Sequence, residues 1–313
     1  MKKIVSSALV LSALTLTSAV AADLPSKKPA PAPVVSSGID AYASFAAGYN
    51  FGNMSIGGIG TDANGLNLAG RATFAAPISG GFGFQADGNF ERSVNNKILA
   101  GMGSDADLVR NTGDVAGHLY MRNSTGLVGV IGQASVSEIN LGILSDRRYY
   151  GGLEAQYYLG NVTLYGQAAY QNANFGTFDF GGGGGIGLGA QGANLMGQVR
   201  YFMTPNAMLA LKGAYETIET DSMDGVTLRH NSWLVGLRGE YRFDQSPISA
   251  FADIDYRSGE FNTAGSKEHE TRAMLGLKYN FGSKTLLDRD RNGASLDPVR
   301  SLKAILPLAG FPQ

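Results

Sequence analysis

The most regular feature of this sequence is an alternation of apolar and polar residues over runs of roughly ten positions. In 229–244 one parity is apolar and the other is mostly ionisable, with Trp233, Val235, Leu237, Tyr241 and Phe243 set against His230, Arg238, Glu240 and Arg242. Successive side chains of a β-strand point to opposite faces. The alternation therefore predicts strands that each have one apolar and one polar face.

The same pattern recurs along most of the chain and predicts about twelve strands. We expect them at 39–50, 66–76, 82–92, 114–123, 127–137, 148–159, 162–174, 194–203, 208–218, 230–243, 248–261 and 268–281. The connections between them alternate in length. Short turns are predicted at 77–81, 124–126, 160–161, 204–207 and 244–247, and the longest loops at 93–113 and 176–193. Strict alternation of this kind is typical of up-and-down β-barrels in membranes.

Composition decides which face of the predicted barrel meets lipid. Charged residues make up only 16% of the chain, whereas aromatic residues reach 10% and glycine 44 positions. A soluble barrel would hide its apolar face, but the aromatic residues here cluster near strand ends, as interfacial girdles do. We therefore predict an all-β fold, an antiparallel transmembrane up-and-down barrel of about 12 strands with short periplasmic turns and long extracellular loops. The net charge of -1 gives no reason to expect nucleic acid as a partner.

The N-terminus predicts export. Lys2 and Lys3 precede an apolar stretch that ends in Ala19-Val20-Ala21, the pattern of a cleaved signal peptide. We divide the chain into a signal peptide (1–21), a Pro-rich periplasmic leader (22–37), the barrel (38–282) and a C-terminal periplasmic tail (283–313). The expected location is the cell outer membrane of a Gram-negative bacterium.

The last predicted strand resembles the signal that the bacterial barrel-assembly machinery reads. Gly276, Tyr279 and Phe281 match its glycine and two aromatic positions, although Met274 stands where a polar residue is usual. The leader at 21–25 is similar to the start of mature alphaproteobacterial porins and related surface barrels. The resemblance implies the assembly machinery, outer-membrane lipid and lipopolysaccharide as partners. A homo-oligomer fits this architecture, but no motif marks a contact between copies.

The polar parity of the strands gives candidates for the lining of a pore. They are Arg71, Arg122, Arg200, Lys212, Arg238, Glu240, Arg242, Asp253, Asp255, Arg257, Arg272 and Lys278. These charges either pair across the strands and fill the interior or line a water-filled pore, and twelve strands lie between the filled and the open barrel sizes. We predict a porin-like channel for passive diffusion of small polar solutes, with its constriction formed by Arg238, Arg242, Asp253, Asp255 and Arg257. The alternative is a non-conducting structural or adhesive surface barrel that acts through its extracellular loops.

Other chemistry has little support in the sequence. There is no cysteine, and His118, His230 and His269 lack the serine setting of a hydrolase, so we expect neither an enzyme nor a cofactor. The glycine run at 181–185 lacks the Lys-Ser/Thr of a phosphate loop. The stretch 288–293 matches half of a calcium loop but has Val299 at its twelfth position, so no metal site is expected. The tail either trails in the periplasm or folds up to occlude the pore.

Overall fold

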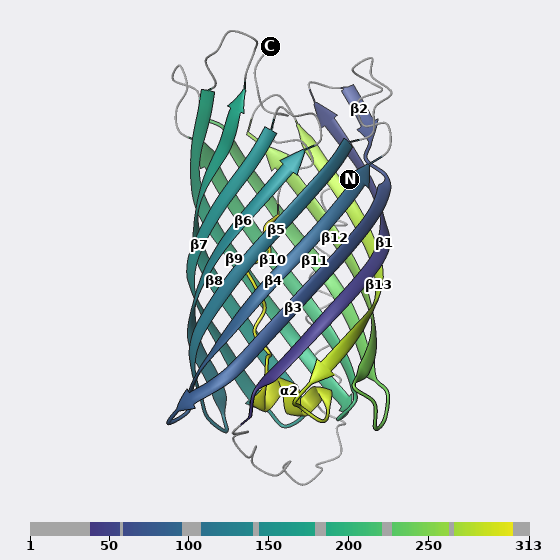
Figure 1. Cartoon of the computed structure of the whole chain (residues 1–313). Coiled ribbons are helices and arrows are strands. Elements are labelled where there is room, and N and C mark those ends of the chain that lie inside the picture. The colour runs from purple at the N-terminus through teal and green to yellow at the C-terminus, as the bar shows by residue number, and fades with distance from the viewer. Residues whose placement is uncertain are drawn as a thin grey trace, which may run out of the picture. The chain divides into compact units, whose positions relative to one another are not determined.

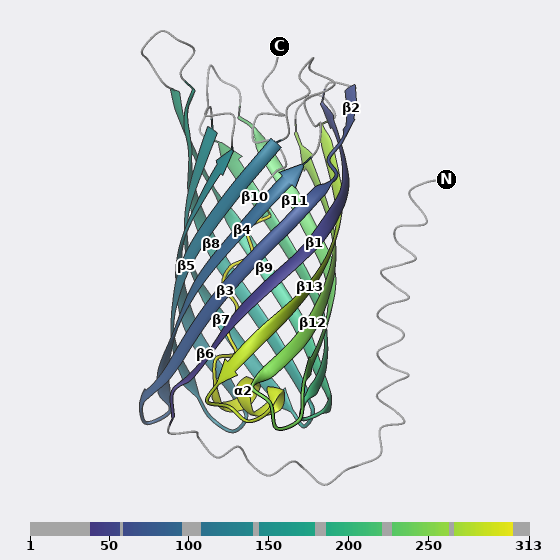
Figure 2. The same ribbon diagram turned by 45° about the vertical axis from the view of Figure 1, so that its right-hand side comes forward.

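The structure is a computed structural model that describes residues 38–56, 59–95, 108–139, 144–178, 186–220, 227–262 and 266–302. The predicted signal peptide, the leader and the glycine run at 181–185 lie outside the described residues. Within the described part, strands form a closed wall of antiparallel neighbours (Figures 1 and 2).

The wall has twelve strands, as the sequence predicts. They are β1 (Asp40–Ile56), β3 (Gly65–Ser79), β4 (Phe82–Asn95), β5 (Leu108–Arg122), β6 (Gly126–Ile139), β7 (Leu144–Leu159), β8 (Val162–Phe178), β9 (Ile186–Thr204), β10 (Ala207–Thr220), β11 (Arg229–Arg242), β12 (Ile248–Phe261) and β13 (Lys267–Phe281). Each strand pairs with the next, and β13 pairs back onto β1, so the barrel has no free edge. A short strand, β2 (Ile59–Asp62), pairs only with the end of β1.

Strand bounds differ from the prediction mainly at the ends that carry the long loops. β5 begins at Leu108 and β9 at Ile186, both inside segments predicted as loops. These segments lack clean alternation, but their backbones continue to pair with β4 and β8. Cross-strand hydrogen bonds therefore extend strands beyond the region where side-chain patterning reveals them.

The outward face of the wall is apolar and the inward face is polar. Leu153 and Leu275 are 67% and 71% exposed, whereas Gln85 and His118 are each 1% exposed. Trp233 and Tyr241 face outward eight residues apart on β11. That spacing is about 27 Å along the strand, or roughly 21 Å in height at a tilt near 40°, close to the apolar band of a membrane barrel. The wall is therefore built to face lipid.

The chain does not leave the barrel after β13. Residues 283–302, here called the lumen segment, enter the interior at the end where the short turns lie (Figures 1 and 2). They begin with α2 (Leu286–Asn292), whose N-cap Thr285 accepts a hydrogen bond from the Asp288 N–H, and continue as extended chain. No helix in the described part of the chain is long and apolar enough to cross a membrane.

The lumen segment corrects the predicted division of the chain. The prediction of a periplasmic tail that begins at residue 283 is wrong for 283–302, because the wall encloses these residues. The alternative that the tail folds up into the barrel fits this part of the chain. Residues 303–313 lie outside the described residues.

Candidate functional site

The lumen segment is held by every strand of the barrel wall. Wall residues with a hydrogen bond or ion pair to it are Asp40 (β1), Arg71 (β3), Gln85 (β4), Arg122 (β5), Gln133 (β6), Gln156 (β7), Thr163 (β8), Arg200 (β9), Glu216 (β10), Glu240 (β11), Asp255 (β12) and Asn280 (β13). Extended chain forms few hydrogen bonds of its own, so in a closed lumen its polar groups need such partners. The segment is thus an integral part of the interior.

The segment runs from the short-turn end toward the loop end. Near the short turns, the Leu287 N–H donates to the Pro205 carbonyl at 3.0 Å, and Arg291 donates to the Gly160 carbonyl at 2.9 Å. At the other extreme, Leu302 accepts from Ser232, which lies only three residues from the loop end of β11. The described chain therefore crosses most of the height of the lumen.

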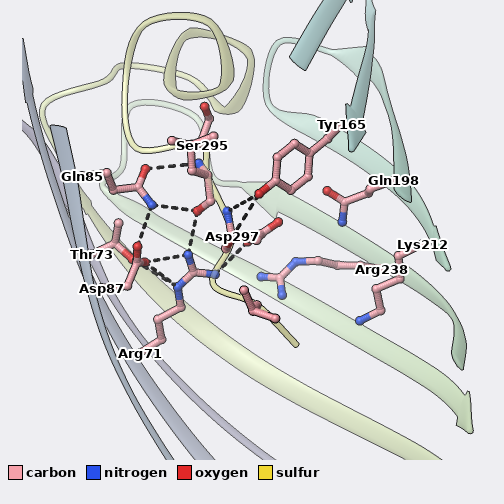
Figure 3. Close-up of polar contacts among 12 residues, drawn as sticks. Arg71, Thr73, Gln85, Asp87, Tyr165, Gln198, Lys212, Arg238, Ser295 and Asp297 are labelled. Carbon is pink, nitrogen blue, oxygen red and sulfur yellow. Dashed lines mark hydrogen bonds and ion pairs between the residues drawn. The ribbon is translucent and has the colours of Figure 1, made fainter. Parts of the chain in front are cut away.

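Asp297 forms the central ion pairs between the lumen segment and the wall. Its carboxylate lies 2.8 Å from a nitrogen of Arg71 and 2.8 Å from one of Arg200, on opposite sides of the barrel wall. Figure 3 shows Asp297 with Arg71 on one side and Tyr165 on the other. The two guanidiniums compensate the charge of the Asp297 carboxylate inside the barrel.

Arg71 and Tyr165, which contact the segment, belong to a buried hydrogen-bond and ion-pair network of wall residues. Asp87 binds Arg71 at 2.7 Å and lies 3.1 Å from the Nε2 of His118, whose Nδ1 lies 2.7 Å from Glu154. Glu154 in turn accepts from the Tyr165 hydroxyl at 2.8 Å. Arg71 and Tyr165 are therefore held by other wall residues as well as by the segment.

The three histidines all have acidic or phenolic partners within the described ranges. His118 pairs with two carboxylates rather than a hydroxyl. His230 lies 3.4 Å from Glu268, and the His269 ring lies 3.2 Å from the Tyr256 hydroxyl. The partners described for these three imidazoles are thus carboxylates and one tyrosine hydroxyl.

The predicted pore-lining residues all make contacts inside the barrel. Most are ion-paired with one another or with neighbours, in the pairs Lys212–Asp255, Arg238–Asp253, Arg257–Glu270, Arg272–Glu91 and Lys278–Glu240. Arg71, Arg122 and Arg200 instead contact the lumen segment. Arg242 donates to the Ser283 carbonyl at the base of the segment. Pairing of this density is what a low-dielectric interior requires.

The structure does not support a constriction formed by residues 238–257. Arg242 lies opposite Ser249, whereas Arg257 lies opposite Leu234, eight residues further along β11. That is about 27 Å along the strand at roughly 3.4 Å per residue, too far apart for one ring. The lumen segment narrows the interior instead, which alternation within strands could not reveal.

A cavity of about 410 Å³ remains between the segment and part of the wall. Its lining includes Glu91, Arg110, Arg238, Asp253, Arg272 and, from the segment, Arg300. The lining mixes apolar side chains with charged groups of both signs, and its volume is that of a small-molecule site. Water and small polar molecules can therefore be accommodated beside the segment.

Several residues that matter most were not singled out by the sequence. Gln85 and Gln133 are uncharged, and only their inward parity marks them. The calcium-like stretch 288–293 forms most of α2, where Asp290 pairs with Arg200 at 2.8 Å and with Arg291 at 3.0 Å. The Asp290 carboxylate is thus ion-paired with two arginines, and this residue of the calcium-like stretch helps to hold α2 against the wall.

The residues of the predicted assembly signal lie on β13, the strand that closes the barrel. Tyr279 and Phe281 face outward near the short-turn end with ring centroids 4.6 Å apart. Gly276 faces inward, where a Cβ atom would lie 2.3 Å from the Phe251 ring. The glycine therefore has a packing role in the folded barrel.

Comparison with known proteins supports the fold. No protein-family model and no curated protein sequence matches this chain. An outer-membrane channel from Pseudomonas putida F1 is similar with a TM-score of 0.55, at 13% identity, over 82% of this chain and 100% of that channel. The translocator domain of the autotransporter NalP from Neisseria meningitidis has a TM-score of 0.48, at 14% identity, over 88% of this chain and 98% of that domain.

At such identities, the likeness shows the architecture alone. The closed twelve-stranded wall, its apolar outer face and the likeness to the Pseudomonas putida channel agree, and the chain is an outer-membrane β-barrel.

Proposed function

We propose that the protein is a channel that lets small polar solutes diffuse across the outer membrane along a narrow path beside the lumen segment. The observation that carries this proposal is the 410 Å³ cavity between the segment and the charged inner wall. A packed interior would leave no such volume, and an apolar one would not hold water. The mixed charges of the lining favour small polar solutes over apolar ones.

Single-channel recording in planar bilayers tests the proposal with the full chain. Arg238 lines the cavity and pairs with Asp253 at 2.9 Å. Arg238→Ala leaves that carboxylate facing the path, so we expect a discrete conductance that becomes more cation-selective. The measurement is the reversal potential in a salt gradient.

Arg229→Ala is the matched control. Arg229 lies at the loop end of β11, with 53% of its side chain exposed, and pairs with Glu219 at the rim. Its removal should leave selectivity nearly unchanged. If the unaltered chain and both variants are folded and none of them gives a discrete current, conduction is refuted.

One observation favours a second candidate, a non-conducting structural or adhesive barrel. The lumen segment contacts every strand, as plugs do, and the polar contacts bind it tightly. If neither the unaltered chain nor a variant with a displaced segment conducts, this candidate is favoured. The loops through which it would act lie largely outside the described residues.

Other expectations from the sequence stand as proposals beside this function. The barrel-assembly machinery would recognise β13 through Gly276, Tyr279 and Phe281. Outer-membrane lipid and lipopolysaccharide would contact the apolar wall. We propose no enzymatic activity, and the likeness of the leader to alphaproteobacterial porins remains a prediction.

A further inference from the structure

Two glutamines of the wall bind the backbone of the lumen segment in the way that a neighbouring β-strand would. The Gln85 amide donates to the Leu296 carbonyl at 2.7 Å and accepts from the Leu296 N–H at 3.1 Å. Gln133 does the same for Val299, at 3.0 Å and 2.7 Å. Each side-chain amide thus satisfies both polar groups of one residue. Such contacts depend on the extended shape of the ligand chain and not on its side chains.

We call Gln85 and Gln133 the glutamine clamps. Along the same stretch of the segment, the wall provides apolar pockets at a regular spacing. Leu296 packs with Tyr120, Leu127 and Tyr165; Val299 packs with Ala116, Ile131, Tyr150 and Ala169; Leu302 packs with Ala214 and Leu234. The three apolar residues of the segment recur every third position, the period of a polyproline II chain. Pro298 lies between the first two, and its ring fixes its own φ near a value that a polyproline II chain also adopts.

Charged wall groups fix the register of the chain in these pockets. Asp297 follows the first apolar position and lies between Arg71 and Arg200. Arg300 follows the second and pairs with Asp255 at 2.6 Å. Both carboxylates that pair with Arg200 belong to the segment, as far as the described residues show. The wall is therefore complementary to one sequence pattern: apolar, Asp, any, apolar, Arg, any, apolar.

We propose that the inner wall is a receptor for extended peptides of this pattern, and that the lumen segment is its tethered ligand. A peptide supplied by another polypeptide on the short-turn side, where the segment itself enters, binds the same clamps and pockets once the segment is displaced. Tethering gives the segment an effective concentration on the order of millimolar, so it excludes free peptide in the resting protein. This activity is separate from conduction.

The experiment uses the full chain with its segment displaced. Asp297→Arg places a cation against Arg71 and Arg200, and Val299→Asp places a carboxylate in an apolar pocket; every wall residue is unchanged. The ligand is a fluorescent synthetic peptide with the sequence of residues 293–302, and its anisotropy is measured with the barrel in detergent micelles. We expect saturable binding to the displaced variant and none to the unaltered chain.

Two controls separate specific binding from adhesion to the barrel. A peptide carrying Asp297→Arg, and a displaced variant that also carries Gln85→Ala and Gln133→Ala, should each reduce the affinity at least tenfold. Heat-dependent electrophoretic mobility confirms that each barrel is folded. If a variant fails this check, the milder Asp297→Ala replaces the double substitution.

The outcome does not depend on whether the barrel conducts. Absence of saturable binding to a folded barrel with an accessible, displaced segment overturns the receptor proposal. So does equal affinity for the native and Asp297→Arg peptides. Binding without any current would instead leave the receptor intact and refute the channel.

Discussion

Asp297→Ala is the substitution whose effect on the lumen segment can be worked out most directly. It removes two contacts of 2.8 Å, to Arg71 and to Arg200. Hydrogen bonds to charged groups contribute about 1.5–3 kcal/mol each. Asp297 is partly exposed, and each arginine keeps a second carboxylate, Asp87 or Asp290, so the lower part of that range applies. We expect the docked state of the segment to lose about 2–4 kcal/mol.

A thiol placed in the segment reports that loss. The chain has no cysteine, and the Ser301 hydroxyl oxygen is buried, so Ser301→Cys introduces a single, nearly isosteric probe. Ser301 also lines the cavity, so the reagent must be a charged thiol reagent too bulky to enter it; labelling then requires the segment to undock, and the rate follows the undocked fraction. A loss of about 2–4 kcal/mol raises that fraction roughly 30- to 700-fold. The measurement is the labelling rate of the Ser301→Cys thiol with and without Asp297→Ala.

Asp288→Ala is the matched control for this prediction. The Asp288 carboxylate accepts hydrogen bonds from Lys284 and Asn292, both within the segment. Its removal changes the charge of the segment by the same amount but breaks no hydrogen bond to the wall. If Asp297→Ala accelerates labelling no more than Asp288→Ala does, the assignment of Asp297 as the principal anchor is wrong.

Two further substitutions test the wall. Leu211 faces outward near mid-height and is 48% exposed, so Leu211→Arg should lower the free energy of unfolding in lipid by about 2–4 kcal/mol. Unfolding of the barrel in liposomes measures this loss, and an equal loss for Leu211→Ala would contradict a lipid-facing position. Gly276→Ala brings a Cβ to 2.3 Å from the Phe251 ring and 2.6 Å from the Phe45 carbonyl oxygen, so we expect about 1–3 kcal/mol of overpacking. Gly239→Ala has nothing within 4 Å and should be near neutral in the same assay; a similar cost for both would reject the packing argument.

The sequence alone determined the wall of this protein. Alternation with a period of two is a local property, and the faces of β11 and β12 could be read from their own residues. The short turns followed from breaks in that alternation, and the outward direction of the apolar face followed from the low charge and the aromatic strand ends. Even the inward position of Arg71 and Arg200 needed only parity.

The partners of those inward residues are visible only in the folded barrel. Residues 293–302 have neither the alternation of a strand nor the period of an α-helix, and the three-residue spacing of their apolar positions does not identify a partner. Their partners lie far away in sequence: Arg71 is 226 residues from Asp297, and Gln133 is 166 residues from Val299. Gln85 and Gln133 carry no charge that would single them out. The position of the segment depends on side chains that twelve strands bring together only when the barrel closes, and no local pattern encodes that assembly.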